Sequence, residues 1–337
     1  MDPHLVRDVV EVINKFGLRA VFVIDSDSRL QASVTDGDVR RALLEGHSLD
    51  SPVATVLNRN FIALADGGNW AQITAQGASR GLSEYPVLDS EGHLVCVEVQ
   101  AHGGDNIPRN NTVVIMAGGK GMRLRPLTES TPKPLLHVAG KPILQHIINN
   151  LRDEGFYDIV LSINYLGEQI ESYFRDGSGF GVAIRYLRED RALGTAGALA
   201  LLKEPISSPI VVMNGDLVLA ASVAKMVDYH VDKQATMTVG AKILETKIPF
   251  GVLSTDGFVL HGIEEKPTHR DLVNAGVYVL NAEVFASVSA ARVTDMPELI
   301  LKNVRGGAVI AYPMHETWVD LGHPADFSRA DELLSGP

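Results

Sequence analysis

The sequence has little of what several classes of protein depend on. Its one cysteine, Cys96, cannot form a disulfide within the chain, and because it lies in an apolar run we expect its thiol to be buried and unreactive. The 11 histidines show no zinc-ligand spacing, and no Ser-His-Asp or Cys-His arrangement stands out. A disulfide-stapled protein, a zinc enzyme and a serine or cysteine hydrolase therefore have no support in the sequence.

Basic charge and long apolar runs are also scarce. The formal net charge is −11, so we expect no face basic enough for nucleic acid or an anionic membrane surface, and local basic clusters must serve small anions. No apolar run approaches the ~20 residues that cross a bilayer, and the first residues do not form a secretory signal. We expect a soluble, cytoplasmic protein with neither nucleic acid nor membrane as a partner.

The first hundred residues contain a repeated pattern. Residues 23–30 (VIDSDSRL) and 87–94 (VLDSEGHL) each predict a β-hairpin, and helix-like segments at residues 5–16 and 69–80 precede them. After the first hairpin, the stretch TDGDVRRALLEG predicts a helix capped by Thr35 or Asp36. The repeated unit is therefore helix, strand, turn, strand.

This repeat resembles a pair of CBS domains, a small α+β regulatory module, over residues 1–105. The resemblance implies an adenine nucleotide as ligand, with Thr35 and Asp38 at the positions that contact its ribose and phosphate. The second copy lacks the matching threonine and aspartate, so at most one half-site is complete. A second interpretation stays open, in which Thr35 and Asp38 only cap the helix and the module serves assembly.

A second domain is predicted after a linker at residues 106–111. Over residues 112–337, β-rich apolar runs alternate with helix-like stretches, which predicts an α/β fold with a mostly parallel, Rossmann-like sheet covered on both faces. In such sheets, ligands collect at the carboxyl ends of the strands. Gly118 and Asp216 each follow a predicted strand, so both are expected at that edge.

The loop at residues 116–136 (MAGGKGMRLRPLTESTPKPLL) has the chemistry of a polyphosphate site. Gly118, Gly119 and Gly121 allow the backbone to approach a phosphate, and Arg123 and Lys133 supply positive charge to its oxygens. The loop is neither a Walker A motif nor a GxGxxG fingerprint.

The whole region resembles the sugar-1-phosphate nucleotidyltransferases, also called nucleotide-sugar pyrophosphorylases. After the glycine-rich loop, the family's further motifs follow in order: LGTAGAL, NGD, FGVL, EEKP, NAGVYV and WVDLG. The resemblance covers residues 112–337 and implies a homo-oligomeric transferase of the class EC 2.7.7, which uses Mg²⁺.

Carried over to this sequence, the resemblance assigns a role to each matching residue. Arg123 and Lys133 would hold the triphosphate and the departing pyrophosphate, and Asp216 and Asp320 would bind Mg²⁺, in accord with the preference of this cation for oxygen ligands. The remaining assignments are nucleotide contacts by Gly118, Gly119, Gly121 and Gly194, and sugar-phosphate contacts by Gly251, Glu265, Lys266 and Asn274.

The implied reaction joins a sugar 1-phosphate to the α-phosphorus of a nucleoside triphosphate and releases pyrophosphate. Motif details favour GTP and a mannose- or glucosamine-type sugar. Three alternatives stay open: a decayed catalytic domain that senses nucleotides, a different base, and a non-sugar phosphate such as phosphocholine.

Overall fold

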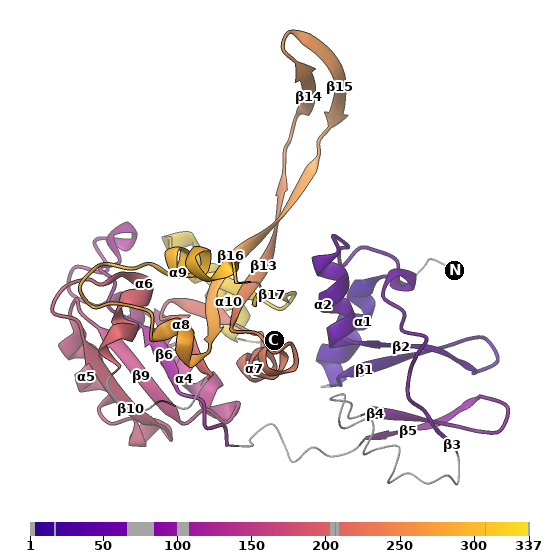
Figure 1. Ribbon diagram of the computed structural model, residues 1–337, viewed down its shortest axis with the longest axis horizontal. Helices are drawn as coiled ribbons and strands as arrows, with labels where there is room; N and C mark the ends of the chain where they lie inside the picture. Colours follow the sequence, from indigo (N-terminus) through magenta and orange to yellow (C-terminus); the bar gives the residue numbers. More distant parts are fainter. Residues whose placement is uncertain are drawn as a thin grey trace. The chain divides into compact units, whose positions relative to one another are not determined.

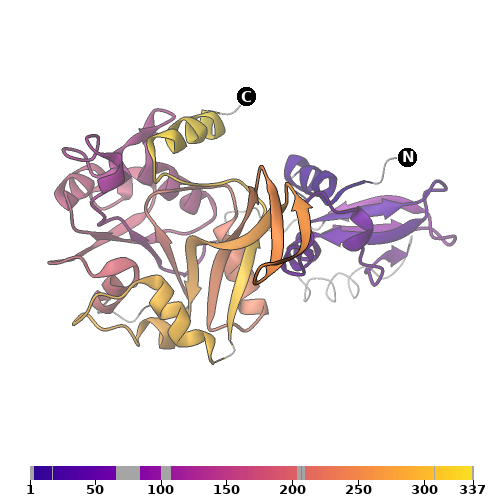
Figure 2. The same ribbon diagram turned by 90° about the horizontal axis from the view of Figure 1, so that it is seen from above.

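The chain divides into two compact units, Met1–Gly104 and Asp105–Pro337 (Figures 1 and 2). The computed structural model describes residues 4–16, 18–65, 84–99, 108–202, 206, 209–306 and 308–335. Each unit is considered by itself, because their positions relative to one another are not determined. No helix in these described residues has the length and apolar character needed to cross a membrane.

The N-terminal unit contains the two predicted hairpins. One pairs β1 with β2 and the other pairs β4 with β5, both antiparallel. The helix predicted at residues 69–80 lies outside the described residues. The elements of this unit are α1 (Val6–Phe16), β1 (Ala20–Ile24), β2 (Leu30–Thr35), α2 (Asp36–Leu44), the 3₁₀ turn η1 (Val53–Thr55), β3 (Leu64–Ala65), β4 (Glu84–Leu88) and β5 (Leu94–Val99).

The prediction of a buried Cys96 thiol was wrong. Cys96 lies on β5, the edge strand of the three-stranded sheet β3-β4-β5, and is exposed. All the β5 residues after Leu94 are exposed, the valines among them included. An apolar run therefore does not by itself imply burial when the strand forms the edge of a small sheet.

The C-terminal unit is built on a seven-stranded sheet with strand order β10-β9-β6-β11-β16-β13-β17. The pairs from β10 to β11 and the pair β13–β17 are parallel, whereas β16 runs antiparallel to both of its neighbours. The mostly parallel sheet is thus confirmed, with one reversed strand. Its strands are β6 (Val113–Met116), β9 (Asp158–Ile163), β10 (Ala183–Arg188), β11 (Ile210–Asn214), β13 (Met237–Lys247), β16 (Thr268–Leu280) and β17 (Val309–Met314).

Helices cover both faces of this sheet, as the alternation of buried side chains along β6 requires. Val113 and Ile115 belong to one apolar cluster and Val114 to another, because neighbouring residues of a strand point to opposite faces. The first cluster includes residues of α4 (Ile143–Asp153), α5 (Gly167–Phe174), α7 (Val223–Asp232) and α10 (Pro324–Ser335). The second includes residues of α6 (Gly194–Gly197), α8 (Ala282–Phe285) and α9 (Met296–Val304).

Short elements complete the unit and carry most of the candidate site. The 3₁₀ turns are η2 (Met122–Leu124), η3 (Lys133–Leu135), η4 (Ser178–Phe180) and η5 (Ala198–Leu201). Three two-stranded sheets are formed by β7 (His137–Val138) with β8 (Lys141–Pro142), β12 (Leu217–Leu219) with β18 (Trp318–Asp320), and β14 (Gly251–Asp256) with β15 (Val259–Glu265). Because β6 and β11 are parallel neighbours, the loops that follow them lie at the same edge of the sheet.

A two-stranded ribbon extends from β13 and β16 beyond the sheet, and Figure 1 shows it ending in the β14–β15 hairpin. The regular strand pairing stops at Lys247↔Thr268 and resumes at Gly251↔Glu265, with residues 248–250 opposite residues 266 and 267. Between these pairs the Ile248 N–H donates to the Pro267 carbonyl, and the Lys266 N–H donates to the Phe250 carbonyl. At the base of the ribbon a β-bulge interrupts the β13–β16 pairing between Val239 and Ala241.

We predict that the C-terminal unit folds without residues 1–107. Arg109, just after the cut, is anchored within this unit, since its backbone N–H donates to the Gly155 carbonyl at 2.8 Å and its guanidinium binds Asp228. The truncated chain should keep its circular dichroism spectrum and melt in one cooperative transition. Removing residues 1–111 instead deletes this anchor and should lower the melting temperature. A truncation at 107 that stays unfolded would contradict the prediction.

Candidate active site

The glycine-rich loop after β6 is shaped by close contacts that a larger residue would break. Gly121 has a left-handed backbone (φ +58°), and a Cβ there would lie 2.8 Å from Thr128 Cγ2. The buried Thr128 hydroxyl also donates to the Gly121 carbonyl at 2.9 Å. Gly119 faces open space, since a Cβ there would have no neighbouring atom within 4 Å. The loop therefore holds a fixed turn and leaves its backbone accessible to a ligand.

Lys133, at the start of η3, connects this loop to the carboxylates at the sheet edge. Its Nζ lies 2.5 Å from Asp216 Oδ2 and 4.0 Å from Asp320 Oδ1. The lysine side chain is only 13% exposed, so solvent screens these charges less than at an open surface. One ammonium thus lies within reach of both predicted metal ligands.

Backbone pairing brings Asp216 and Asp320 together. Asp216 follows β11, and Asp320 ends β18, where it pairs with Leu217 of β12. The Leu321 N–H also donates to the Asp216 carbonyl at 3.1 Å. Burial raises the pKa of Asp320, the nearby Asp216 raises it further, and Lys133 opposes both effects. The two carboxylates are therefore close enough to repel one another.

These residues surround one pocket of about 280 Å³. It contains most of the predicted phosphate and metal residues, including Gly119, Gly121 and Arg123. The full lining is Met116, Ala117, Gly119, Gly121, Met122, Arg123, Leu124, Lys133, Pro134, Gly215, Asp216, Asp320 and Gly322. The described chain thus places two cationic and two anionic side chains around a space large enough for phosphate groups.

Gly118 and Gly194 have structural neighbours that account for their lack of a side chain. A Cβ on Gly118 would lie 3.1 Å from Asn164 Cβ, and one on Gly194 would lie 2.6 Å from the Thr294 carbonyl oxygen. Gly194 also has a left-handed backbone (φ +85°). Neither residue is among those that line the pocket.

The NAGVYV segment lies against the NGD segment. A Cβ on Gly276 would be 2.6 Å from Asn214 Nδ2, and the Trp318 indole N–H donates to the Ala275 carbonyl at 2.9 Å. Asn274, predicted to contact the sugar, is exposed at the bulge of β13–β16, and its side-chain oxygen accepts from the Gly276 N–H at 3.0 Å. Three predicted motifs therefore meet next to the metal candidates.

The other predicted sugar residues lie on the ribbon and are not part of the pocket lining. Gly251 and Glu265 are paired, and a Cβ on Gly251 would be 2.9 Å from Glu265 Oε2. Lys266 is exposed and has a left-handed backbone (φ +50°), which is uncommon for a residue other than glycine. The structure brings these three residues together with one another but not with Lys133.

Sequence reasoning missed Glu189, which follows β10. Its carboxylate accepts from the Ser162 hydroxyl at 2.6 Å and from the Leu193 N–H at 2.8 Å, so it ties β9 to the LGTAGAL segment. A Cβ on Gly118 would lie 3.2 Å from the same carboxylate. Its place at the carboxyl end of a strand, next to a glycine-rich segment, was the available signal.

Two further residues were missed although their motifs were recognised. Gly215 and Gly322 both line the pocket, and a Cβ on Gly215 would lie 2.8 Å from the Met116 carbonyl oxygen. Glycine at 215 therefore permits the close approach of the segments that follow β6 and β11.

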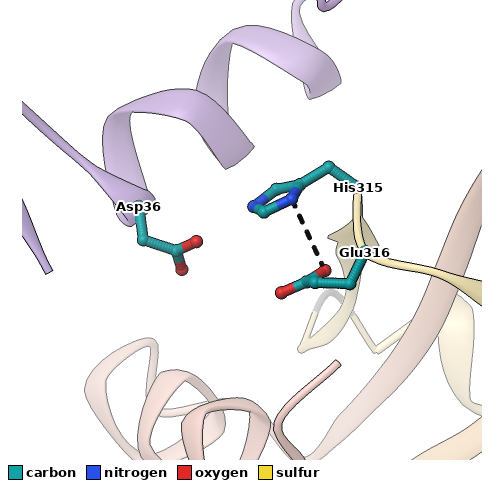
Figure 3. A group of neighbouring side chains, drawn as sticks. All are labelled: Asp36, His315 and Glu316. Carbon is teal, nitrogen blue, oxygen red and sulfur yellow. Dashed lines mark ion pairs between the residues drawn. The ribbon is translucent and has the colours of Figure 1, made fainter. Parts of the chain in front are cut away.

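His315 and Glu316 follow β17 and lead toward β18 (Figure 3). Their side chains lie together, with His315 Nδ1 3.8 Å from Glu316 Oε2. Asp36, drawn in the same view, belongs to the N-terminal unit, and the relative position of the units is not determined. The three residues are therefore not assigned as a metal site.

The N-terminal unit has a separate pocket of about 190 Å³, whose lining includes Thr35, Asp38, Arg41 and Phe22. Thr35 caps α2: its Oγ1 accepts from the Asp38 N–H, and its own N–H and hydroxyl donate to Asp38 Oδ2. Arg41 donates to the other carboxylate oxygen of Asp38 at 3.1 Å. Thr35 and Asp38 are thus helix-capping residues that also border a cavity.

The fold and the pocket around Lys133 define an α/β protein with a glycine-rich loop beside two neighbouring carboxylates. Residues 112–335 match the model of the nucleotidyl transferase family, and the chain belongs to this family. The relatives include mannose-1-phosphate guanylyltransferase of Mycobacterium tuberculosis (32% identical; 66% of this chain and 64% of the relative) and UTP–glucose-1-phosphate uridylyltransferase of Synechocystis (34%; 64% and 61%).

Solved structures support the same fold. A putative glucose-1-phosphate thymidylyltransferase from Bacillus anthracis, in complex with a sucrose, has a TM-score of 0.54 at 26% identity and covers 66% of this chain and 94% of its own. HddC from Yersinia pseudotuberculosis has a TM-score of 0.52 at 24% identity over 66% of this chain and 99% of its own. The chain spans less than two thirds of the length of the curated relatives named above.

The charge arrangement predicts that Asp320→Asn stabilises the metal-free protein. The raised pKa of Asp320 means that folding disfavours its ionised form, so the destabilising effect is present at neutral pH and fades as the pH falls toward 3.8, the ordinary value for aspartate. In a chelator at neutral pH, the melting temperature of Asp320→Asn should exceed that of the unaltered protein. Asp232→Asn, at an exposed carboxylate on α7, should not produce this gain. A lower melting temperature for Asp320→Asn would contradict the prediction.

Proposed function

We propose that this protein transfers a nucleoside monophosphate from a nucleoside triphosphate to a sugar 1-phosphate, forming a nucleotide sugar and pyrophosphate. The observation that carries the proposal is the pocket in which Lys133, Arg123, Asp216 and Asp320 surround an open glycine-rich loop. The family membership and the activities named for its relatives support it.

Asp216 and Asp320 fit a divalent cation. The ammonium of Lys133 lies 2.5 Å from the Asp216 carboxylate and 4.0 Å from the Asp320 carboxylate, so the two carboxylates already attract one positive charge. Carboxylate oxygens are the donors that Mg²⁺ prefers, and it commonly takes one or two of them together with substrate phosphates. When bound, the cation would neutralise phosphate charge as the reaction proceeds.

The cationic side chains would orient the triphosphate. Both reactants are anionic and repel one another, so the pocket must bring their charges together and align the attacking oxygen with the α-phosphorus. Arg123 and Lys133 would bind the phosphates that leave as pyrophosphate. No protein base is required, because the attacking oxygen of a sugar phosphate is already ionised at neutral pH.

The ribbon would supply the sugar side of the site. Glu265 would accept hydrogen bonds from sugar hydroxyls, Lys266 would bind the sugar phosphate, and Gly251 and Asn274 would border the sugar. The left-handed backbone of Lys266 supports a functional position, since such a conformation costs a non-glycine residue about 1–3 kcal/mol and is common where function demands it.

GTP and a mannose-type sugar are the substrates we propose. Mannose-1-phosphate guanylyltransferase is the name of the relative from M. tuberculosis and, for the catalytic subunit beta, of one from Drosophila melanogaster, each 32% identical to this chain. The Synechocystis relative is named for UTP and glucose 1-phosphate, which keeps a second base and sugar in consideration. A decayed domain is less well supported, because the charged residues of the pocket are all in place.

The test is pyrophosphate release from five nucleoside triphosphates, each combined with mannose, glucosamine and glucose 1-phosphates and with phosphocholine, in the presence of Mg²⁺. We expect the highest rate with GTP and a hexose or hexosamine 1-phosphate. Asp216→Asn should lower the rate at least ~100-fold, because it removes a ligand of the cation that stabilises the transition state. Asp232→Asn is the matched control and should stay active.

No release from any sugar 1-phosphate by folded protein would refute the transferase activity. Release with phosphocholine alone would assign a different acceptor, and a normal rate for Asp216→Asn would remove Asp216 from the metal site.

For the N-terminal unit we propose a CBS-type regulatory role with an adenine nucleotide as ligand. The pocket bordered by Thr35 and Asp38 also includes aromatic and apolar side chains, among them Phe22, Phe61 and Ile62. A base could pack against these side chains while the polar residues at α2 meet ribose or phosphate. The pocket thus combines four apolar lining residues with seven polar ones that could hydrogen-bond to a ligand.

We predict that AMP, ADP or ATP raises the melting temperature of the full-length protein, because a ligand that binds only the folded state stabilises it. Asp38→Ala should abolish the shift. Asp25→Ala is the matched control: Asp25 also accepts backbone hydrogen bonds, from Asp27 and Arg29, but lies outside this pocket. If none of the three nucleotides shifts the unaltered protein, the unit does not bind them.

A further inference from the structure

Lys242 stands where the sheet meets the segment that carries Asp320. It lies on β13, shortly after the bulge, and pairs with Met314, the last residue of β17. Beyond Met314 the chain leaves the sheet through His315 and Glu316 (Figure 3) and enters β18, which ends at Asp320. The lysine is therefore beside the start of the connection between β17 and β18.

The ammonium of Lys242 binds the backbone of this connection. Its Nζ donates to the Glu316 carbonyl at 2.8 Å and to the His315 carbonyl at 3.2 Å. Because both acceptors are main-chain oxygens, the contact fixes the path of the chain and not the orientation of a side chain. Hydrogen bonds from a charged donor are stronger than those between neutral groups.

The surroundings of Lys242 make it unfavourable for the side chain to carry a positive charge. Burial lowers the pKa of Lys242, whereas the Glu316 carboxylate raises it and Arg329 lowers it. A half-buried charge is stable only when it is well hydrogen-bonded, so the two carbonyl contacts offset the cost of removing the ammonium from water. The ammonium of Lys242 thus stabilises the turn at residues 315–316, and the carbonyls of this turn stabilise the ammonium.

The contacts that follow the held turn lead directly to the metal candidate. The Ala220 N–H donates to the Thr317 carbonyl at 2.9 Å, and Trp318 is bound to the Ala275 carbonyl through its indole. Asp320 then pairs with Leu217, immediately after Asp216. The turn at residues 315–316 therefore leads directly into the contacts that hold β18 and Asp320 in place.

We propose that Lys242 is a positioning residue for the metal site: by holding the His315–Glu316 turn, it keeps Asp320 opposite Asp216. The role of Asp320 in this inference rests on the proposed function. The contact of Lys242 with the turn does not depend on it. Lys242 itself touches neither substrate nor metal in this account. It acts only through the backbone that precedes β18.

The test compares Lys242→Met with Lys242→Arg, which keeps a cationic donor, and with Lys233→Met just after α7, which removes an exposed lysine paired with Asp232. Hydrogen exchange of the peptide covering residues 315–321 reports on the turn without any substrate. We expect faster exchange in Lys242→Met, partial rescue in Lys242→Arg and no change in Lys233→Met.

The second readout is Mn²⁺ binding, followed by electron paramagnetic resonance in the presence of GTP. We expect Lys242→Met to weaken Mn²⁺ binding about tenfold, the lower part of the range seen when residues supporting metal ligands are changed. The Mg²⁺ concentration for half-maximal activity should rise in parallel, while the KM for sugar 1-phosphate at saturating Mg²⁺ stays within about twofold.

Unchanged exchange at residues 315–321 in Lys242→Met would overturn the proposal, as would normal Mn²⁺ affinity despite faster exchange. Failure of the unaltered protein to release pyrophosphate would count against the proposed function alone, because the exchange comparison does not depend on turnover.

Discussion

The contact of Lys133 with Asp216 is the interaction around which the candidate active site is arranged. It joins the loop after β6 to the loop after β11, which lie side by side because the two strands are parallel neighbours. The absence of a side chain at Gly215 permits this approach, since a Cβ there would lie 2.8 Å from the Met116 carbonyl oxygen. In the absence of ligand, the lysine balances the carboxylates. With a nucleoside triphosphate bound, the phosphates would pair with Lys133, and the cation would pair with the carboxylates.

The ribbon and the segment that carries Asp320 are connected through the backbone. The bulge at the base of the ribbon places Gly276 against Asn214, and Trp318 binds the carbonyl of Ala275. Lys242, on the strand that forms the other half of the ribbon, binds the turn before β18. The ribbon and the segment that carries Asp320 are therefore joined by backbone contacts at several points.

The sequence predicted the parts of this structure that depend on local patterns. Alternating apolar runs predicted the sheet, and the glycine-rich loop predicted a site after β6, where a pocket lies, because strand periodicity and backbone access are properties of short segments. The exposure of Cys96 could not be predicted in this way, since it depends on whether β5 has neighbours on both sides. Glu189 and Lys242 were missed for a related reason: their hydrogen-bond partners are distant in sequence or lie on the main chain, and only the strand-end position of Glu189 gave a signal.

The central claim is that Asp216 and Asp320 would hold a divalent cation and that Lys133 would bind the phosphates of the triphosphate. Anomalous diffraction from crystals grown with Mn²⁺ and a non-hydrolysable GTP analogue tests it most directly. The account predicts a Mn²⁺ peak at coordination distance from an oxygen of each carboxylate, roughly 2 Å as for other small hard cations, with Lys133 no longer bound to Asp216. A peak at other residues, or nucleotide bound with the Lys133–Asp216 contact intact, would contradict it.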